Sequence, residues 1–160
     1  MTGTGKKPVS PAVGVLALVA RDDKVLLVCR GNAPRQGLWG FPGGKVKWGE
    51  QLRAAAVREL LEETGIEARP EAIVDVLETQ EGSDIENPDF HYVLIAVYCR
   101  WLAGDPFAAD DAQDAAWFSL EEIADLKDTA IAAVAPLARR ILEEPSDLLK
   151  KREWQGMGGN

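Results

Sequence analysis

Three glutamates, Glu59, Glu62 and Glu63, have the i, i+3 and i+4 spacing that brings side chains to one face of a helix. Like charges at this spacing repel each other by roughly a few tenths of a kcal/mol per pair. A hard divalent cation such as Mg²⁺ or Mn²⁺ removes the repulsion, because these ions prefer carboxylate oxygens. The three glutamates therefore indicate a metal site, although a solvated acidic helix face fits the same residues.

The element that must position these glutamates is a predicted helix from about Gln51 to Thr64. The segment has no Gly or Pro and is rich in Ala, Leu, Arg and Glu, which are good helix formers. It follows a turn at Gly43–Gly44, and Gly65 ends it where a positive φ is favoured. Five residues share the side of the helix that we expect to pack on a sheet, opposite the glutamates: Ala54, Val57, Leu60, Leu61 and Thr64.

The stretch from Gly44 to Ile66 resembles the Nudix box of the MutT/Nudix hydrolases. That pattern is Gly, five residues, Glu, seven residues, Arg-Glu, an aliphatic residue, any residue, Glu-Glu, any residue, Gly and an aliphatic residue. Every fixed position is filled here, by Gly44, Glu50, Arg58, Glu59, Leu60, Glu62, Glu63, Gly65 and Ile66. So many matches at fixed spacing almost never arise by chance, so the resemblance is specific for the reaction class.

The resemblance implies an enzyme that uses Mg²⁺ or Mn²⁺ to hydrolyse the pyrophosphate bond of a nucleoside diphosphate linked to another moiety. The metal ligands that it implies are Glu59, Glu62, Glu63 and the backbone carbonyl of Gly43. The catalytic residues that it implies are Glu59, Glu62, Arg58 and Glu50. Arg58 is expected to orient carboxylates, including Glu50, through a buried ion pair. Glu50 also fits a carboxylate at a helix N-terminus, where the helix dipole favours it.

The group that activates the attacking water stays open. By the same resemblance it is either a glutamate of the box or an acidic residue in a later loop. The segment from 78 to 89, which we expect to be a loop, offers Glu78, Glu81, Asp84, Glu86 and Asp89. Their spacing selects none of them.

Four cations, Arg30, Arg35, Lys45 and Lys47, lie close to the box in the sequence. We expect substrate to be bound by Arg30, Arg35, Lys45, Gly44 and His91. A guanidinium can hold a phosphate with two hydrogen bonds, and a glycine lets backbone approach a metal or phosphate closely. Each cation taken singly also fits a plain surface charge. The aromatic candidates for stacking on the base are Trp39, Phe41, Phe90, Tyr92, Trp101 and Trp117, although aromatic residues in strands more often belong to the core.

The substrate is predicted from loop resemblance. The segments 30–34, 37–44 and 117–122 resemble small bacterial ADP-ribose pyrophosphatase-like members, which favours ADP-ribose or a related nucleoside diphosphate sugar. A proline that marks many ADP-ribose hydrolases is replaced by Glu81, so MutT-like hydrolysis of nucleoside triphosphates is the alternative. The alternative of another class is a non-catalytic Nudix binding or regulatory module. Such modules typically lose box glutamates, and all of them are kept here.

Composition narrows the class of partner. The chain has 160 residues and a net charge of −8, which disfavours binding of nucleic acid through a broad phosphate-neutralising surface. No apolar run is long enough to span a membrane, and no signal peptide is apparent at the start. Cys29 and Cys99 lie in apolar strand-like runs, which favours reduced core thiols and a cytoplasmic setting. We expect a small-molecule nucleotide as the partner, and the sequence leaves a homodimer open.

The remaining segments predict one Nudix domain over 10–149, with loose ends at 1–9 and 150–160. Strands are expected at 11–20, 24–30, 72–77, 90–101 and 115–119. A helix should begin with a cap at Ser119, and another should run over 129–144 with a kink or restart at Pro136. This order is neither a parallel α/β repeat nor an all-β pattern. It predicts an α/β (α+β) fold with helices on both faces of a mixed sheet, in agreement with the α/β/α sandwich of the resembled family.

Overall fold

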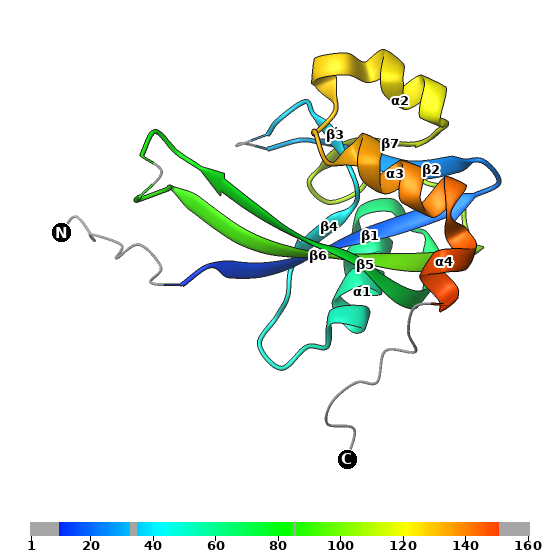
Figure 1. Ribbon diagram of the computed structural model, residues 1–160, viewed down its shortest axis with the longest axis horizontal. Coiled ribbons are helices and arrows are strands. Elements are labelled where there is room, and N and C mark those ends of the chain that lie inside the picture. The colour runs from blue at the N-terminus through cyan, green and yellow to red at the C-terminus, as the bar shows by residue number, and fades with distance from the viewer. Residues whose placement is uncertain (1–9, 33–34, 85, 151–160) are drawn as a thin grey trace.

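The apolar run after Pro11 forms the central strand β1 (Ala12–Arg21) of the computed structural model, which describes residues 10–32, 35–84 and 86–150 (Figure 1). The other strands are β2 (Lys24–Arg30), β3 (Trp39–Gly40), β4 (Gly43–Lys45), β5 (Glu67–Glu81), β6 (Phe90–Ala103) and β7 (Ala112–Phe118). The helices are α1 (Leu52–Thr64), α2 (Leu120–Leu126), the 3₁₀ turn η1 (Lys127–Thr129), α3 (Val134–Glu143) and α4 (Pro145–Lys150). The predicted loose ends, apart from residue 150, lie outside the described residues.

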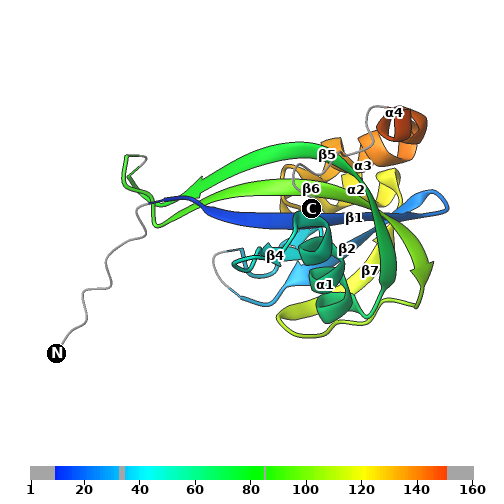
Figure 2. The ribbon, with the colours of Figure 1, turned by 90° about the horizontal axis from the view of Figure 1, so that it is seen from below.

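The strands form one mixed sheet in the order β3-β2-β1-β6-β5, with β4 paired to β1 and β7 paired to β2. Strands β1 and β6 are parallel over the length of β1, from Ala12↔Tyr92 to Ala20↔Arg100. The other pairs are antiparallel. Strands β5 and β6 continue beyond the body of the protein as a long hairpin, the arm, which projects in Figures 1 and 2.

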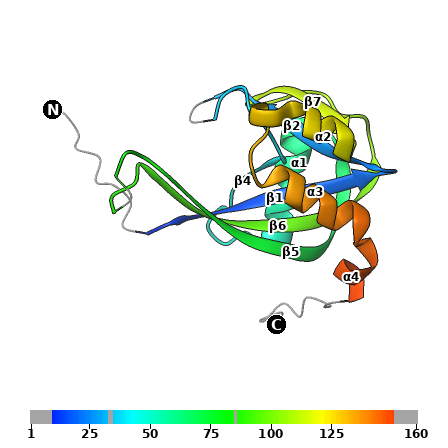
Figure 3. The same ribbon diagram turned by 45° about the horizontal axis from the view of Figure 1, so that its top comes forward.

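Helices cover both faces of the sheet, as the sequence predicts. Figure 2 shows α1 on one face, and Figure 3 shows α2 and α3 across the other. Leu60 and Ile66 pack with Val15 on the α1 face, whereas Leu137 and Ile141 of α3 belong to a second cluster. Both cysteines are buried and free, as expected of core thiols. Among the described helices, none is long and apolar enough to cross a membrane.

The buried side of α1 differs from the predicted one. Leu61 is 51% exposed, whereas Ala55, Ala56 and Leu60 are fully buried. The buried arc is therefore rotated toward the side that carries Glu59. The reason is that glycine strand β4 packs against this side of the helix and leaves room for carboxylates. The prediction that the glutamates lie opposite the packed face is wrong for Glu59 and Glu63.

Other segments also depart from their predictions. The predicted turn at Gly43–Gly44 is the short strand β4, which pairs with β1. Strand β5 runs through Pro70 and on to Glu81, so the first residues of the predicted acidic loop are strand. The register with β6 shifts between Pro70 and Ala72, and such a bulge accommodates a residue without an N–H. Helix α3 begins at Val134 and places Pro136 in its first turn, where a missing N–H costs nothing. The predicted start of this helix near Thr129 is therefore wrong, and no restart occurs at Pro136. The predicted cap at Ser119 is a full capping box.

Candidate active site

The two glycines of β4 lie beneath α1, and the structure gives a different reason for each. A Cβ on Gly44 would lie 2.5 Å from the carboxylate carbon of Glu59, so any side chain there would displace that carboxylate. A Cβ on Gly43 would lie 2.1 Å from the carbonyl oxygen of Val15, in the neighbouring strand. Gly44 therefore makes space for a functional group, whereas Gly43 is needed for the pairing of β4 with β1.

Glu63 projects from α1 toward the same strand and accepts a hydrogen bond from the Gly43 N–H at 3.3 Å. Burial raises the pKa of Glu63 to about 8, although the Gly43 N–H and the charge of Arg30 oppose the shift. The nearby charge of Glu59 raises this pKa further. Glu63 is thus a half-buried carboxyl group beside a second carboxylate, with no basic partner within ion-pair distance among the described residues.

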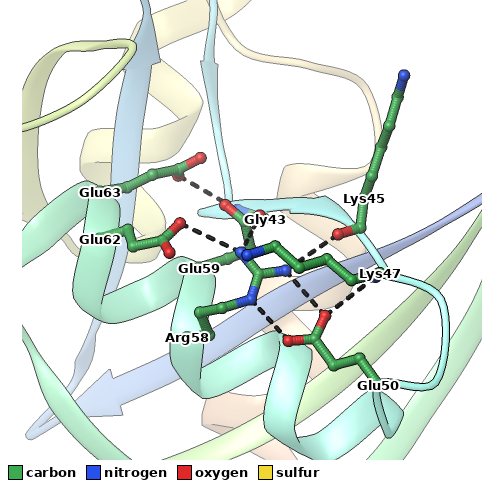
Figure 4. A network of polar contacts seen from close by, with 8 residues as sticks. All are labelled: Gly43, Lys45, Lys47, Glu50, Arg58, Glu59, Glu62 and Glu63. Atoms are coloured by element: carbon green, nitrogen blue, oxygen red, sulfur yellow. Dashed lines mark hydrogen bonds and ion pairs between the residues drawn. The ribbon is translucent and has the colours of Figure 1, made fainter.

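Arg58 connects the box residues into one network (Figure 4). Its guanidinium donates to both oxygens of Glu50, from Nε at 2.6 Å and from Nη2 at 2.9 Å. It also donates from Nη1 to Glu59 at 2.9 Å and to Glu62 at 3.2 Å, and from Nη2 to the Lys45 carbonyl at 3.1 Å. The predicted ion pair between Arg58 and Glu50 is therefore present, and one side chain orients three carboxylates.

Glu50 lies just before α1 and closes the loop that leads into the helix. Besides Arg58, its carboxylate accepts from the Lys47 N–H at 3.1 Å. The hydrogen bonds from Arg58, and then from Lys47, lower the pKa of Glu50 to about 2. The side chain thus stays charged throughout the neutral range and holds the guanidinium in place.

The donor set fits a hard divalent cation, although the carboxylates are not gathered around one point. Among the described residues, no three acidic, histidine or cysteine side chains are close enough together to hold an ion. The reason is visible in Figure 4: Arg58 draws Glu59 and Glu62 to itself, and Gly43 holds Glu63. A half-buried carboxyl group beside a second carboxylate is nevertheless the arrangement whose charge a cation would offset.

A cavity of about 540 Å³ opens in front of these residues, within the size range of small-molecule sites. Glu59, Glu62 and Glu63 line one wall. The other charged residues that line it are Arg30, Arg35, Lys45, Glu81, Asp110 and Asp111. The structure thus brings together the predicted glutamates and three of the four predicted cations.

Other predicted site residues lie away from the cavity. Lys47 does not line it, and His91 occupies the opposite face of β6 from the lining residue Tyr92. There His91 contacts Glu78 at 3.0 Å between Nε2 and Oε1. Of the five acidic residues from 78 to 89 that could activate water, Glu81 alone is among the described lining residues.

Three of the six aromatic candidates line the cavity, and the other three pack in the core. Phe41, Phe90 and Tyr92 line the cavity, and Lys45 Nζ lies 5.8 Å from the Tyr92 ring centroid. Trp39 packs edge-on against Phe118 in the core cluster. Trp101 and Trp117 pack with the α1 cluster.

Asp110 and Asp111 are lining residues that the sequence analysis does not identify. Their position depends on the pairing of β2 with β7, which joins Arg30 to Ala112, and on the Gly31 N–H bond to the Asp111 carbonyl. Asp110 has a left-handed φ of 55°, and its charge raises the pKa of Glu63. The acidic pair in the sequence gives no hint that strand pairing brings it to the box.

Comparison with known proteins gives three informative matches. The profile of the NUDIX domain matches residues 8–142. An ADP-ribose pyrophosphatase of Methanocaldococcus jannaschii is 34% identical over 113 residues, which cover 71% of this chain and 64% of that protein. A CTP pyrophosphohydrolase of Escherichia coli is 42% identical over 89 residues, which cover 51% of this chain and 66% of that protein.

A solved structure shows the same fold. The crystal structure of a bifunctional NMN adenylyltransferase/ADP ribose pyrophosphatase from Francisella tularensis, complexed with AMP and Mn ion, superposes with a TM-score of 0.65. It is 27% identical, and the match covers 84% of this chain and 42% of that chain. The matched part of this chain thus spans about two thirds of the length of each of the two curated relatives. It spans less than half of the Francisella tularensis chain.

Proposed function

Since this chain belongs to the NUDIX family, we propose that it is a pyrophosphohydrolase that depends on Mg²⁺ or Mn²⁺. The observation that carries the proposal is the pair Glu59 and Glu63, held half-buried against Gly43–Gly44 at the wall of a cavity that also contains cations. The complete box argues against a non-catalytic binding module, because such a module has no need of an arginine that orients three carboxylates.

Hydrolysis requires a nucleophile to reach a phosphorus already surrounded by negative oxygens, so the barrier is chiefly electrostatic. Bound divalent ions would neutralise phosphate charge and lower the pKa of water. Glu59, Glu62 and Glu63 are the side chains that would hold them, and the backbone carbonyl of Gly43 stays a predicted fourth ligand. Arg58 and Glu50 position the carboxylates and do not touch the substrate. Arg30 and Lys45, which line the cavity, are placed to bind phosphate oxygens.

We propose ADP-ribose, or a related nucleoside diphosphate sugar, as the substrate. The name of the Methanocaldococcus jannaschii relative supports it, and so does charge, since the described lining contains six carboxylates and three cations. A diphosphate diester brings about two negative charges into this field, against nearly four for a triphosphate. The name of the Escherichia coli relative supports the alternative, a nucleoside triphosphate.

The test is a side-by-side measurement of kcat/KM for ADP-ribose, the canonical and oxidised nucleoside triphosphates, NADH and dinucleoside polyphosphates. We expect ADP-ribose or another nucleoside diphosphate sugar to rank first. A triphosphate that leads by tenfold, about 1.4 kcal/mol of transition-state preference, would select the alternative.

The metal requirement is tested with the same assay. EDTA should abolish hydrolysis, and an excess of Mg²⁺ or Mn²⁺ should restore it. Full turnover with all divalent ions chelated would refute the proposed chemistry.

A further inference from the structure

We propose that Arg35 and Glu81 form a charge-compensated pair that makes the site prefer a nucleoside diphosphate bearing a neutral, hydroxyl-rich group over a nucleoside triphosphate. The inference rests on the proposed function and deepens it, because it assigns the choice between the two substrate classes to particular residues.

Side-chain hydrogen bonds hold the pair in the cavity wall. The Arg35 guanidinium donates from Nε to the Glu81 carboxylate and from Nη2 to the Thr79 hydroxyl at 2.8 Å. Thr79 and Glu81 are two residues apart on β5, so they present their side chains on the same face of the strand. All three residues line the cavity, and the Arg35 and Glu81 side chains are only 31% and 26% exposed.

The pair belongs to a different wall from the box glutamates. Glu59 and Glu63 come from α1, whereas Glu81 is the last residue of β5 and is paired in register with Phe90. Figure 2 shows α1 at the body of the sheet and the end of β5 on the projecting arm. In this proposal, the arm contacts the part of a bound substrate that extends away from the reacting phosphate. This part is the sugar of a nucleoside diphosphate sugar, or the additional phosphate of a triphosphate.

Charge compensation decides between these two groups. The charge of Glu81 cancels that of Arg35, so a further phosphate would find no net positive charge at this wall. A substrate hydroxyl group can donate a hydrogen bond to the Glu81 carboxylate and accept one from the Arg35 guanidinium. A carboxylate can accept about four hydrogen bonds and a guanidinium can donate five, which leaves capacity after the contacts within the pair.

Single and double neutral variants test the pair, with the ratio of kcat/KM for ADP-ribose to that for ATP as the readout. Glu81→Gln leaves Arg35 uncompensated and should shift the ratio toward ATP. Because ATP brings two additional negative charges to this wall, we expect a shift of about tenfold, or about 1.4 kcal/mol. Arg35→Gln should shift the ratio about tenfold the other way, and the double variant should return close to the wild-type ratio.

Glu78→Gln is the matched control. Glu78 is on the same strand and changes the net charge equally, but it pairs with His91 and does not line the cavity. In this variant, the ratio of kcat/KM for ADP-ribose to that for ATP should stay at the wild-type value. Because the ratio compares two substrates in one protein, a general loss of folded enzyme cancels. The shift in the ratio caused by Glu81→Gln or Arg35→Gln should appear mainly in KM.

The outcomes separate this inference from the proposed function. An unchanged ratio in Glu81→Gln, or an equal shift in Glu78→Gln, would overturn the role of the pair while hydrolysis itself stands. A wild-type protein that hydrolyses no nucleoside diphosphate sugar and no nucleoside triphosphate, with either Mg²⁺ or Mn²⁺, would instead refute the proposed function, and the inference with it.

Discussion

Gly44→Ala separates the stability of this fold from the geometry of its site. The added Cβ would lie 2.5 Å from the carboxylate carbon of Glu59, whereas carbon atoms in contact are about 3.5–4.0 Å apart. The Glu59 carboxylate must therefore move by about 1 Å or more. A misplacement of this size costs about 10²-fold in rate, or about 2.7 kcal/mol of transition-state stabilisation.

Stability should hardly change in this variant. The nearest atoms to the new Cβ are the far end of a flexible side chain, and Gly44 does not have a positive φ. A glycine-to-alanine change in compatible backbone stabilises by about 0.4–1 kcal/mol, which offsets the local adjustment. We expect a melting temperature within a few degrees of the wild-type value, measured by circular dichroism, together with the loss in kcat/KM.

Gly43→Ala is the control that behaves in the opposite manner. Its Cβ would meet backbone of β1, which cannot move aside cheaply, so this variant should lose about 1–3 kcal/mol of unfolding free energy. If Gly44→Ala kept kcat/KM within threefold of wild type, Glu59 would not need its present position, and the assignment of this wall as the reaction centre would fail.

The other predictions concern the carboxylates. Glu59→Gln and Glu63→Gln should each lower kcat by at least about 10²-fold while the fold persists, as judged by circular dichroism; near-normal activity in both would place the metal elsewhere. Glu50 has a folded-state pKa of about 2, below its usual 4.5, so its contribution to stability is present above about pH 4.5 and is lost as the pH falls toward 2. The destabilisation by Glu50→Gln, measured by urea unfolding, should therefore shrink over that range, and a penalty that is constant with pH would contradict the ion pair.

The elements of the box could be predicted from sequence because their causes are local. Helix propensity, the left-handed Gly65 with φ of 73° and the capping box at Ser119 depend on residues a few positions apart. The ion pair of Arg58 with Glu50 is implied by the family resemblance, and the structure contains it.

What the sequence could not supply depends on contacts between distant segments. A helical wheel assumes that only apolar residues are buried, and so it misses that strand β4 covers Glu59 and Glu63. Asp110 reaches the cavity through pairing of β2 with β7. The contact of Arg35 with Glu81 joins a loop to the arm across 46 positions, and no local pattern encodes it.

The parallel pairing of β1 with β6 has a consequence for how the protein is made. Each partner pair in this ladder joins residues 80 positions apart, whereas β4 meets β1 only about 30 positions away. Closing the longer loop costs more chain entropy, and long-range parallel pairing is slow. A ribosome must therefore release most of the chain before the centre of the sheet can close, although the box helix and its glycine strand have already emerged. Pulse-labelled hydrogen exchange during refolding should show the amides of β6 protected after those of α1, and the reverse order would contradict this sequence of events.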